Sequence, residues 1–239
     1  MTMSKGCVRR CTFCNVPDLW PKFSIRSAEK LVDEIKKNKI EYQVNLTHFT
    51  DSLVNGSMKH FRELNQRLGE LKNNEKFKPL KYMGQFICRT QSEQPDTDWK
   101  LMHDAGANLL VTGFESYSER VRKHMGKNYS NEDIAFHFEQ SAYYGIKNVA
   151  LMFVGYPIET EEDHEYNKLF LHFFSYFIVY SVLIFIDFQF SLSIFEFHVR
   201  FSHFTFDFQL SPSSFNFHHL DVHILTFEFQ DPPLNFQFS

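Results

Sequence analysis

The feature that most constrains the fold is a regular alternation of two apolar spacings between residues 27 and 160. Apolar residues three and four positions apart are typical of amphipathic helices, and the short apolar runs between them are typical of buried strands. The expected helices span 27–35, 57–71, 96–105, 118–125 and 131–144, and a further helix starts at 160. The expected strands span 42–49, 81–88, 109–112 and 149–154. A repeated βα unit predicts an α/β chain with a parallel sheet, because each connection is long enough for a crossover.

Polar or glycine residues follow each expected strand. They are residues 50–52, Arg89, residues 113–116 and residues 155–157. Because parallel strands end at the same edge of a sheet, we expect these residues to lie near one another. The sheet is expected to be either open and doubly wound or rolled into a barrel, and barrel enzymes gather their chemistry at this edge.

The strongest motif is a cluster of three cysteines, Cys7, Cys11 and Cys14, near the N-terminus. Thiolates are the usual ligands of iron–sulfur clusters, and this spacing can wrap one side of a compact cluster. Three thiolates on a [4Fe–4S] cluster leave one iron open to bind another molecule. The alternative is a zinc site completed by a distant ligand, although no second pair of zinc-type ligands follows. Cys88 is expected to be a buried free thiol that packs as a small apolar group.

The charge and the N-terminal residues limit where this chain works. The net charge is −4, so no strongly basic surface indicates nucleic acid binding. Residues 1–6 contain no apolar stretch typical of a secretory signal. We therefore expect a cytoplasmic chain with reduced thiols, in which clustered cysteines bind metal or carry out redox chemistry.

The cysteine motif resembles that of the radical S-adenosylmethionine (SAM) superfamily, and the resemblance covers about residues 4–168. It is carried by segments in order along the chain: Ser4-Lys-Gly-Cys, Cys11-Thr-Phe-Cys, Trp20-Pro21, Arg26-Ser27, Phe49-Thr-Asp-Ser, Gly113-Phe-Glu-Ser and Gly155-Tyr-Pro-Ile-Glu-Thr. These look like members that are found beside a cobalamin-binding domain. The resemblance implies an enzyme with a partial (β/α)6 TIM-like barrel. It also implies a [4Fe–4S] cluster that cleaves SAM reductively and generates a 5′-deoxyadenosyl radical, acting on an unknown substrate.

The resemblance also implies roles for individual residues. Cys7, Cys11 and Cys14 would bind iron. The other implied contacts are with SAM: Phe13 against the adenine, Thr50, Asp51 and Ser52 at the methionyl amine, Glu115 and Ser116 near the ribose or carboxylate, and Gly155 and Pro157 beside the adenine. Arg89 would meet a carboxylate or a ribose. The alternatives are structural: Asp51 would cap a turn, Arg89 would pair with a surface acid, and residues 155–157 would form a plain turn.

The same resemblance implies partners. The cofactors would be the [4Fe–4S] cluster and SAM, together with cobalamin if a domain absent from this sequence supplies it. A reductant protein of the flavodoxin or ferredoxin type is expected. A rival enzyme is a radical SAM methylthiotransferase or methyltransferase that acts on RNA, although no basic RNA-binding module follows. The non-enzyme rival is an inactive fragment that binds a cluster or zinc.

The sequence changes character near residue 168. Residues 169–239 hold 19 of the 29 Phe, only one Arg, and no Gly or Lys. We therefore expect two parts: an incomplete radical SAM core over 1–168, truncated at both barrel edges, and an atypical Phe-rich tail over 169–239 that is non-native or disordered. Three interpretations of the tail compete. They are a product of a shifted reading frame, a membrane anchor over 169–186, and a genuine Phe-rich β appendage.

Overall fold

The structure is a computed structural model that describes residues 1–174, 180–187, 199–201, 204–206, 215–217 and 220–228. Its helices are α1 (Val16–Leu19), α2 (Ala28–Tyr42), α3 (Met58–Lys72), α4 (Asp96–Ala105), α5 (Glu119–His124), α6 (Asn131–Tyr143) and α7 (Glu161–Phe174), with a 3-10 turn at Glu75–Phe77. Its strands are β1 (Ser4–Lys5), β2 (Ser24–Ile25), β3 (Leu46–Phe49), β4 (Lys81–Phe86), β5 (Ala107–Glu115), β6 (Lys147–Val154), β7 (Tyr180–Asp187), β8 (Val199–Phe201), β9 (Phe204–Phe206), β10 (Phe215–Phe217) and β11 (Leu220–Glu228).

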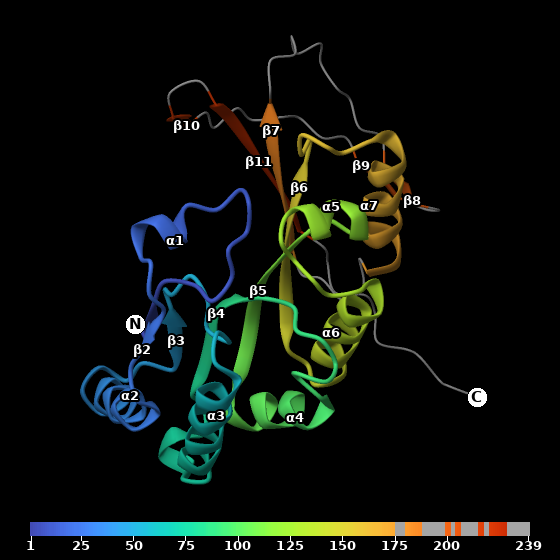
Figure 1. Ribbon diagram of the computed structural model, residues 1–239. Coiled ribbons are helices and arrows are strands. Elements are labelled where there is room, and N and C mark those ends of the chain that lie inside the picture. The colour runs from blue at the N-terminus through green and yellow to red at the C-terminus, as the bar shows by residue number, and fades with distance from the viewer. Residues whose placement is uncertain (175–179, 188–198, 202–203, 207–214, 218–219, 229–239) are drawn as a thin grey trace.

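The main sheet has the strand order β10-β11-β7-β6-β5-β4-β3. The five strands from β3 to β7 are parallel, whereas β11 and β10 are antiparallel to their neighbours. Helices α2, α3, α4 and α6 follow one another around this sheet in chain order (Figure 1). The predicted α/β fold is confirmed. Among the described residues the strands form an open sheet rather than a closed barrel.

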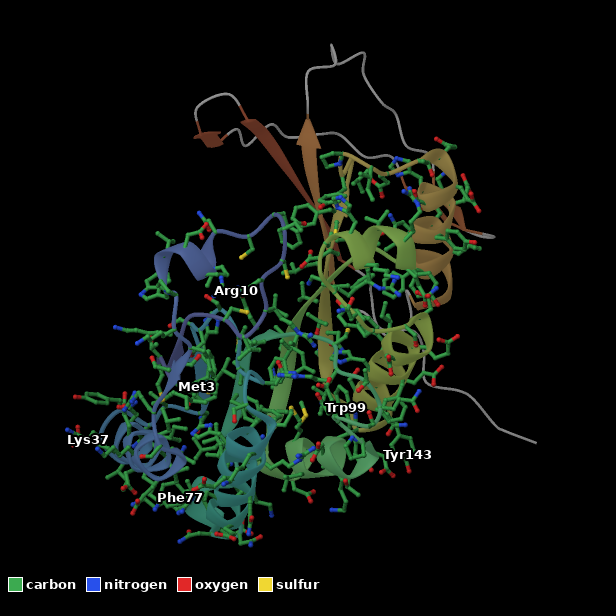
Figure 2. All side chains as sticks on the ribbon, viewed as in Figure 1. Met3, Arg10, Lys37, Phe77, Trp99 and Tyr143 are labelled. Carbon is green, nitrogen blue, oxygen red and sulfur yellow. The ribbon has the colours of Figure 1, made fainter. Side chains whose placement is uncertain are left out.

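The main apolar core lies between the sheet and helices α2, α3 and α4. Alternate residues of β4 are buried, such as Tyr82 and Phe86, and they pack with Phe61 of α3 and Trp99 of α4. Figure 2 labels Trp99 among the side chains between the sheet and its helices. Burying a side chain of this size stabilises the fold by about 1.5–3 kcal/mol. The core therefore fixes the sheet and, with it, the positions of the strand ends.

Two expected strands differ from those observed by more than two residues at one end. The strand expected at 42–49 begins only at Leu46, because α2 continues through Tyr42 and ends at Gln43, whose left-handed φ of 55° and N–H bond to Lys39 terminate it. The strand expected at 109–112 runs from Ala107 to Glu115 as β5. Pairing with β6 supplies hydrogen bonds over residues that had looked like a loop, and a bulge between Gly113 and Glu115 absorbs the mismatch.

The first residues of the chain lie along the end of β3. The N-terminal amine of Met1 donates to the carbonyl of His48 at 2.8 Å, and the N–H of Thr50 donates to the carbonyl of Met1 at 3.0 Å. β1 then pairs with β2 in a short antiparallel ribbon. These contacts hold the segment that leads into the cysteine motif against the β3 edge of the sheet.

The packing continues past residue 168. Helix α7 runs to Phe174, and the ring of Phe170 is buried 4.4 Å from that of Phe114 and 5.3 Å from that of Phe138. β7 then pairs in parallel with β6. The division at residue 168 and the origin of the tail stay predictions, and much of the tail lies outside the described residues. The candidate membrane span at 169–186 includes residues 175–179, which lie outside the described residues. No described helix is long and apolar enough to cross a membrane.

Candidate functional site

The C-terminal edge of the parallel sheet gathers the predicted residues. Thr50, Asp51 and Ser52 follow β3, Arg89 follows β4, Glu115 and Ser116 end β5, and Gly155 and Pro157 follow β6. The cysteine loop, residues 7–14, reaches toward the ends of β5 and β6 (Figure 1). Arg10, labelled in Figure 2, lies on this loop. Residues from five separate parts of the sequence thus meet at one edge, as expected for parallel strands.

The cysteine loop is fastened through its middle residues. The N–H of Thr12 donates to the carbonyl of Met125 at 3.2 Å. The half-buried ring of Phe13 packs edge-on against Phe153 of β6, with 4.6 Å between the ring centroids. Phe13 thereby joins a small apolar cluster with Val121, Met125, Phe153 and Tyr156. These contacts place Cys11 and Cys14 at the ends of β5 and β6. Contact of Phe13 with an adenine stays a prediction.

The three thiols suit a thiolate-bound cluster. All three are free and half-buried, and a backbone N–H at Arg9 donates to the Sγ of Cys7 at 3.4 Å. The N–H of Cys14 donates to the carbonyl of Cys11 at 3.0 Å, which turns the loop back on itself. Burial raises the pKa of the Cys11 thiol, and the nearby cation of Lys127 partly offsets this. An N–H donor to sulfur and a neighbouring charge are among the features that tune iron-bound thiolates.

The thiols are not arranged around a single ion. Within the part of the chain that the structure describes, no three His, Cys, Asp or Glu side chains gather as the ligands of one metal ion would. A zinc site needs its donors about 2.0–2.3 Å from one point. In a [4Fe–4S] cluster each thiolate binds a different iron, so the sulfur atoms stand farther apart. Three thiolates without a histidine are the donor chemistry of an iron–sulfur cluster, and the choice of a cluster over a zinc ion stays a prediction.

Glu115 is the most unusual residue at this edge. Its φ of 72° lies in the left-handed region, which a residue with a side chain occupies at a cost of about 1–3 kcal/mol. Its buried carboxylate accepts a hydrogen bond from the Nζ of Lys127 at 3.0 Å, and the same Nζ donates to the carbonyl of Gly113 at 2.7 Å. The Lys127 ammonium also stands 5.8 Å from the centre of the Phe13 ring. One buried cation thus contacts both the strained end of β5 and the cysteine loop.

Two further residues hold the end of β5. The buried guanidinium of Arg122 donates to the carbonyl of Ser116 at 2.7 Å, and the hydroxyl of Tyr129 donates to the carbonyl of Phe114 at 3.3 Å. The Ser116 hydroxyl donates to the Oδ1 of Asn167 at 3.2 Å, which ties the strand end to α7. Backbone strain persists only where the surroundings impose it, and these bonds do so here. They present Glu115 and Ser116 together.

Asp51 has a structural task in this fold. Its buried carboxylate accepts hydrogen bonds from the N–H of Met3 at 3.0 Å and from the N–H of Ser4. The exposed Thr50 bonds to Met1 and Thr2. The turn at 50–52 therefore holds the chain that leads to Cys7. A carboxylate can accept about four hydrogen bonds, so contact of Asp51 with an amine stays a prediction beside this structural role.

The turn after β6 is held by Glu159. Its carboxylate accepts hydrogen bonds from the N–H of Gly155 at 2.6 Å and the N–H of Tyr156 at 3.1 Å, and burial raises the pKa of this carboxyl. Gly155 has a φ of 83° and is exposed, as is Pro157. Because glycine carries no side chain, the backbone of this turn is open to close approach by a flat ligand.

Arg89 and Cys88 follow β4. Arg89 donates to the carbonyls of Asn55 at 2.6 Å and Gly56 at 3.0 Å, and it pairs with Glu93 at 3.4 Å. This agrees with the structural alternative, although the Nε of Arg89 is buried without a partner among the described residues. Cys88 is fully buried, and burial raises the pKa of its thiol to about 12. It packs in the apolar cluster around Phe114, as expected for a structural thiol.

Sequence reasoning did not single out Lys127, Arg122, Tyr156 or Glu159. Each acts through partners that are distant in the sequence or through a local turn, so no spacing rule marks it. The one available signal is that Tyr156 and Glu159 lie within the segment Gly155-Tyr-Pro-Ile-Glu-Thr, which carries part of the family resemblance. The structure therefore adds the supporting residues to a site whose first members were predicted.

An open parallel sheet with three loop thiols at its C-terminal edge is the arrangement expected of an α/β protein that binds a thiolate-ligated metallocofactor. The comparison with protein families agrees. The model of the Radical SAM superfamily matches residues 1–170, and the chain belongs to that superfamily. The predicted family is confirmed, and with it the prediction of an enzyme.

Solved structures share the fold. The radical SAM methyltransferase TsrM from Kitasatospora setae, solved with cobalamin and a [4Fe–4S] cluster bound, superposes with a TM-score of 0.69 at 18% identity, over 78% of this chain and 34% of that chain. The cobalamin-dependent radical SAM enzyme OxsB superposes with a TM-score of 0.61 at 21% identity, over 72% of this chain and 26% of that chain.

Sequence relatives include group-transfer enzymes. Cytidylyl-2-hydroxyethylphosphonate methyltransferase from Streptomyces wedmorensis is 30% identical over 128 residues, which are 52% of this chain and 22% of the relative. tRNA-2-methylthio-N(6)-dimethylallyladenosine synthase from Aquifex aeolicus is 26% identical over 177 residues, 70% of this chain and 38% of the relative. The chain thus spans less than half the length of these curated relatives.

Proposed function

We propose that this chain forms the core of a radical SAM enzyme in which Cys7, Cys11 and Cys14 hold a [4Fe–4S] cluster. The observation that carries the proposal is the set of three half-buried free thiols on one loop, fastened to the C-terminal edge of the parallel sheet. When bound, the cluster would supply the electron for reductive cleavage of SAM into methionine and a 5′-deoxyadenosyl radical, and that radical would abstract hydrogen from the substrate. The substrate itself is not specified by these residues.

The remaining residues of the edge would bind and orient SAM. Glu115 and Ser116 would accept hydrogen bonds from ribose hydroxyls or lie near the carboxylate, because the bulge of β5 directs them to the strand end. Gly155 and Pro157 would lie beside the adenine, together with Phe13. Asp51, with Thr50 and Ser52, would contact the methionyl amine, since a carboxylate stabilises an ammonium group. Their support is their shared position at one edge of the sheet.

Lys127 would serve this site as a fixed cation. Its ammonium is buried between Glu115 and the carbonyl of Gly113, so it cannot swing into solvent. A cation beside iron-bound thiolates reduces the net negative charge of the site and thereby favours the reduced state of the cluster. It also neutralises Glu115, which would otherwise be a buried unpaired carboxylate.

The reaction type we propose is methyl transfer. It is supported by the likeness of the sequence to a methyltransferase and by the likeness of the fold to the methyltransferase TsrM. The cofactors would then include cobalamin as well as SAM and the cluster, and a flavodoxin- or ferredoxin-type protein would supply electrons.

The test is anaerobic purification of the full chain, reconstitution with iron and sulfide, and incubation with SAM and dithionite. We expect about four irons per chain, the stoichiometry of one [4Fe–4S] cluster, and release of 5′-deoxyadenosine. The variant Cys11→Ala should lose both iron and nucleoside, whereas Cys88→Ala should retain both. Zinc in place of iron, or intact iron in Cys11→Ala, would contradict the proposal.

Methylthio transfer to RNA is a second candidate, favoured by the match to the tRNA-modifying enzyme over 70% of this chain. The two reactions separate by the product. Incubation with bulk tRNA, methyl-labelled SAM, sulfide as the sulfur donor and dithionite as the reductant, followed by digestion, would give a methylthio-adenosine only in the second case. Cobalamin-dependent transfer of label without sulfur would support the first.

A further inference from the structure

The cysteine loop is fastened at Thr12 by a small hydrogen-bond network. The Thr12 hydroxyl lies 2.8 Å from the hydroxyl of Tyr156 and 3.4 Å from the carbonyl of His124, to which it donates. The Tyr156 hydroxyl also lies 3.0 Å from the Nδ1 of His124. Thr12 stands between Cys11 and Phe13, so the network grips the loop between its second and third cysteines. Residues 144 positions apart are joined by one hydroxyl contact.

Tyr156 is suited to this task because its ring and its hydroxyl have different surroundings. The residue is 7% exposed, and its ring packs with Val121, Met125 and Phe153 in the cluster that also receives Phe13. The hydroxyl can donate one hydrogen bond and accept others at the same time, so it can serve Thr12 and His124 together. A buried tyrosine hydroxyl normally finds such a partner.

Tyr156 also belongs to the turn that follows β6. Its N–H donates to the Oε2 of Glu159, which receives the N–H of Gly155 as well. Gly155 and Pro157 on either side are the candidate adenine contacts. The side chain of one residue therefore holds the cysteine loop, while its backbone is part of the turn on which SAM would rest.

We propose that Tyr156 is a positioning residue that couples the cysteine loop to the turn after β6. The hydroxyl bridge to Thr12 sets the distance between the thiols and the Gly155 turn, so the subsites for the cluster and for SAM are aligned by one contact. This inference rests on the proposed function for what the loop and the turn hold. The mechanical coupling itself concerns only residues of this chain and is testable without any cofactor.

The first test measures amide hydrogen exchange in the cofactor-free full chain. In Tyr156→Phe, amides of the cysteine loop should exchange about five-fold faster than in the wild type, the factor that corresponds to about 1 kcal/mol for a lost hydrogen bond. Exchange in α3, which packs in a separate core, should not change. Thr12→Val should reproduce the effect, and Thr12→Ser should not, because serine keeps the hydroxyl. The double variant Thr12→Val/Tyr156→Phe should be no worse than either single one.

Wild-type exchange of the loop in both Tyr156→Phe and Thr12→Val would overturn the proposal. Additive effects in the double variant would also overturn it, since the two hydroxyls would then act independently. Thr12 is exposed, so its variants test the bridge even if the tyrosine variant fails to fold. A second measurement uses the reconstituted protein. Tyr156→Phe should keep its iron content. It should bind SAM about five-fold more weakly than the wild type, with binding measured from the SAM-induced change in the cluster spectrum. Full SAM affinity would contradict the coupling, whereas absence of iron in the wild type would refute only the proposed function.

Discussion

The apolar core beneath α2, α3 and α4 and the polar edge at the ends of β5 and β6 hold the chain in different ways. In the core, side chains such as Phe61, Phe86 and Trp99 are buried against one another, and stability follows from the area removed from water. At the edge, Glu115 and Lys127 are almost as deeply buried, yet they are charged and paired. Each region keeps its shape for a separate reason.

The two regions differ in how many contacts fix their geometry. In the core many weak contacts stabilise the fold together, so the fold is retained when one side chain is changed. At the edge a few directional bonds impose the left-handed conformation of Glu115 and the position of the cysteine loop. Loss of one such bond should disturb the site before it disturbs the fold. The predictions below test this contrast.

The largest effect on stability should come from the core. Trp99 is 1% exposed, and Trp99→Ala leaves a cavity that should lower the free energy of unfolding by about 3–5 kcal/mol in urea titrations. Tyr143→Ala is the matched control, because Tyr143 is 80% exposed on α6 and its loss should cost less than about 0.5 kcal/mol. A small effect in Trp99→Ala would show that the core is not the main source of stability.

Lys127→Met should cost about 3 kcal/mol, because it leaves the Glu115 carboxylate buried without its cation. The double variant Glu115→Gln/Lys127→Met should recover a large part of that loss, since it removes both charges. Lys123→Met, at an exposed position, serves as the control. Equal unfolding free energies in the single and the double variant would show that the ion pair is not what holds this edge.

The pH dependence of stability should reveal His137. Burial lowers the pKa of this imidazole from 6.5 to about 4, so the folded chain resists its protonation. The stability that follows from keeping His137 neutral is fully present above pH 6.5. It is lost as the pH falls toward 4, because the unfolded chain binds the proton at a higher pH than the folded chain does. Relative to His137→Gln, the wild type should lose about 3 kcal/mol over this window in denaturant titrations. Parallel pH curves for the two proteins would contradict the assignment.

The smallest stability effect is expected at two glycines, which should differ in their effect on iron uptake. Gly126 (φ 81°) and Gly145 (φ 67°) both have left-handed backbones, so alanine at either should cost about 1 kcal/mol. A Cβ at Gly126 would lie 3.3 Å from the carbonyl oxygen of Arg10 and 3.9 Å from the Cα of Cys11, whereas at Gly145 it would meet nothing within 4 Å. Iron uptake should therefore slow in Gly126→Ala and stay normal in Gly145→Ala. Equal uptake rates would show that the loop does not depend on this contact.

The contrast also explains what the sequence could predict. Helices α3, α4 and α6 follow apolar periodicity, so their positions were predicted to within a residue or two, and the parallel order followed from the βα repeat. The three cysteines stand out by spacing alone. The left-handed Glu115 and the contacts of Lys127 and Tyr156 could not be predicted, because they depend on bonds between segments distant in the sequence. Asp51 was placed at the correct edge, but its bonds to Met3 and Ser4 were not foreseen.

We propose that the cysteine loop carries a cluster on three thiols and that the fourth thiol belongs to the core. Iron and sulfide analysis distinguishes these roles in four single variants purified without oxygen: Cys7→Ala, Cys11→Ala, Cys14→Ala and Cys88→Ala. We predict that each of the first three loses the iron and the brown chromophore while remaining folded by circular dichroism. Cys88→Ala should keep its iron, with at most a modest loss of stability from the small cavity. Full iron in any of the first three, or loss of iron from folded Cys88→Ala, would contradict this account.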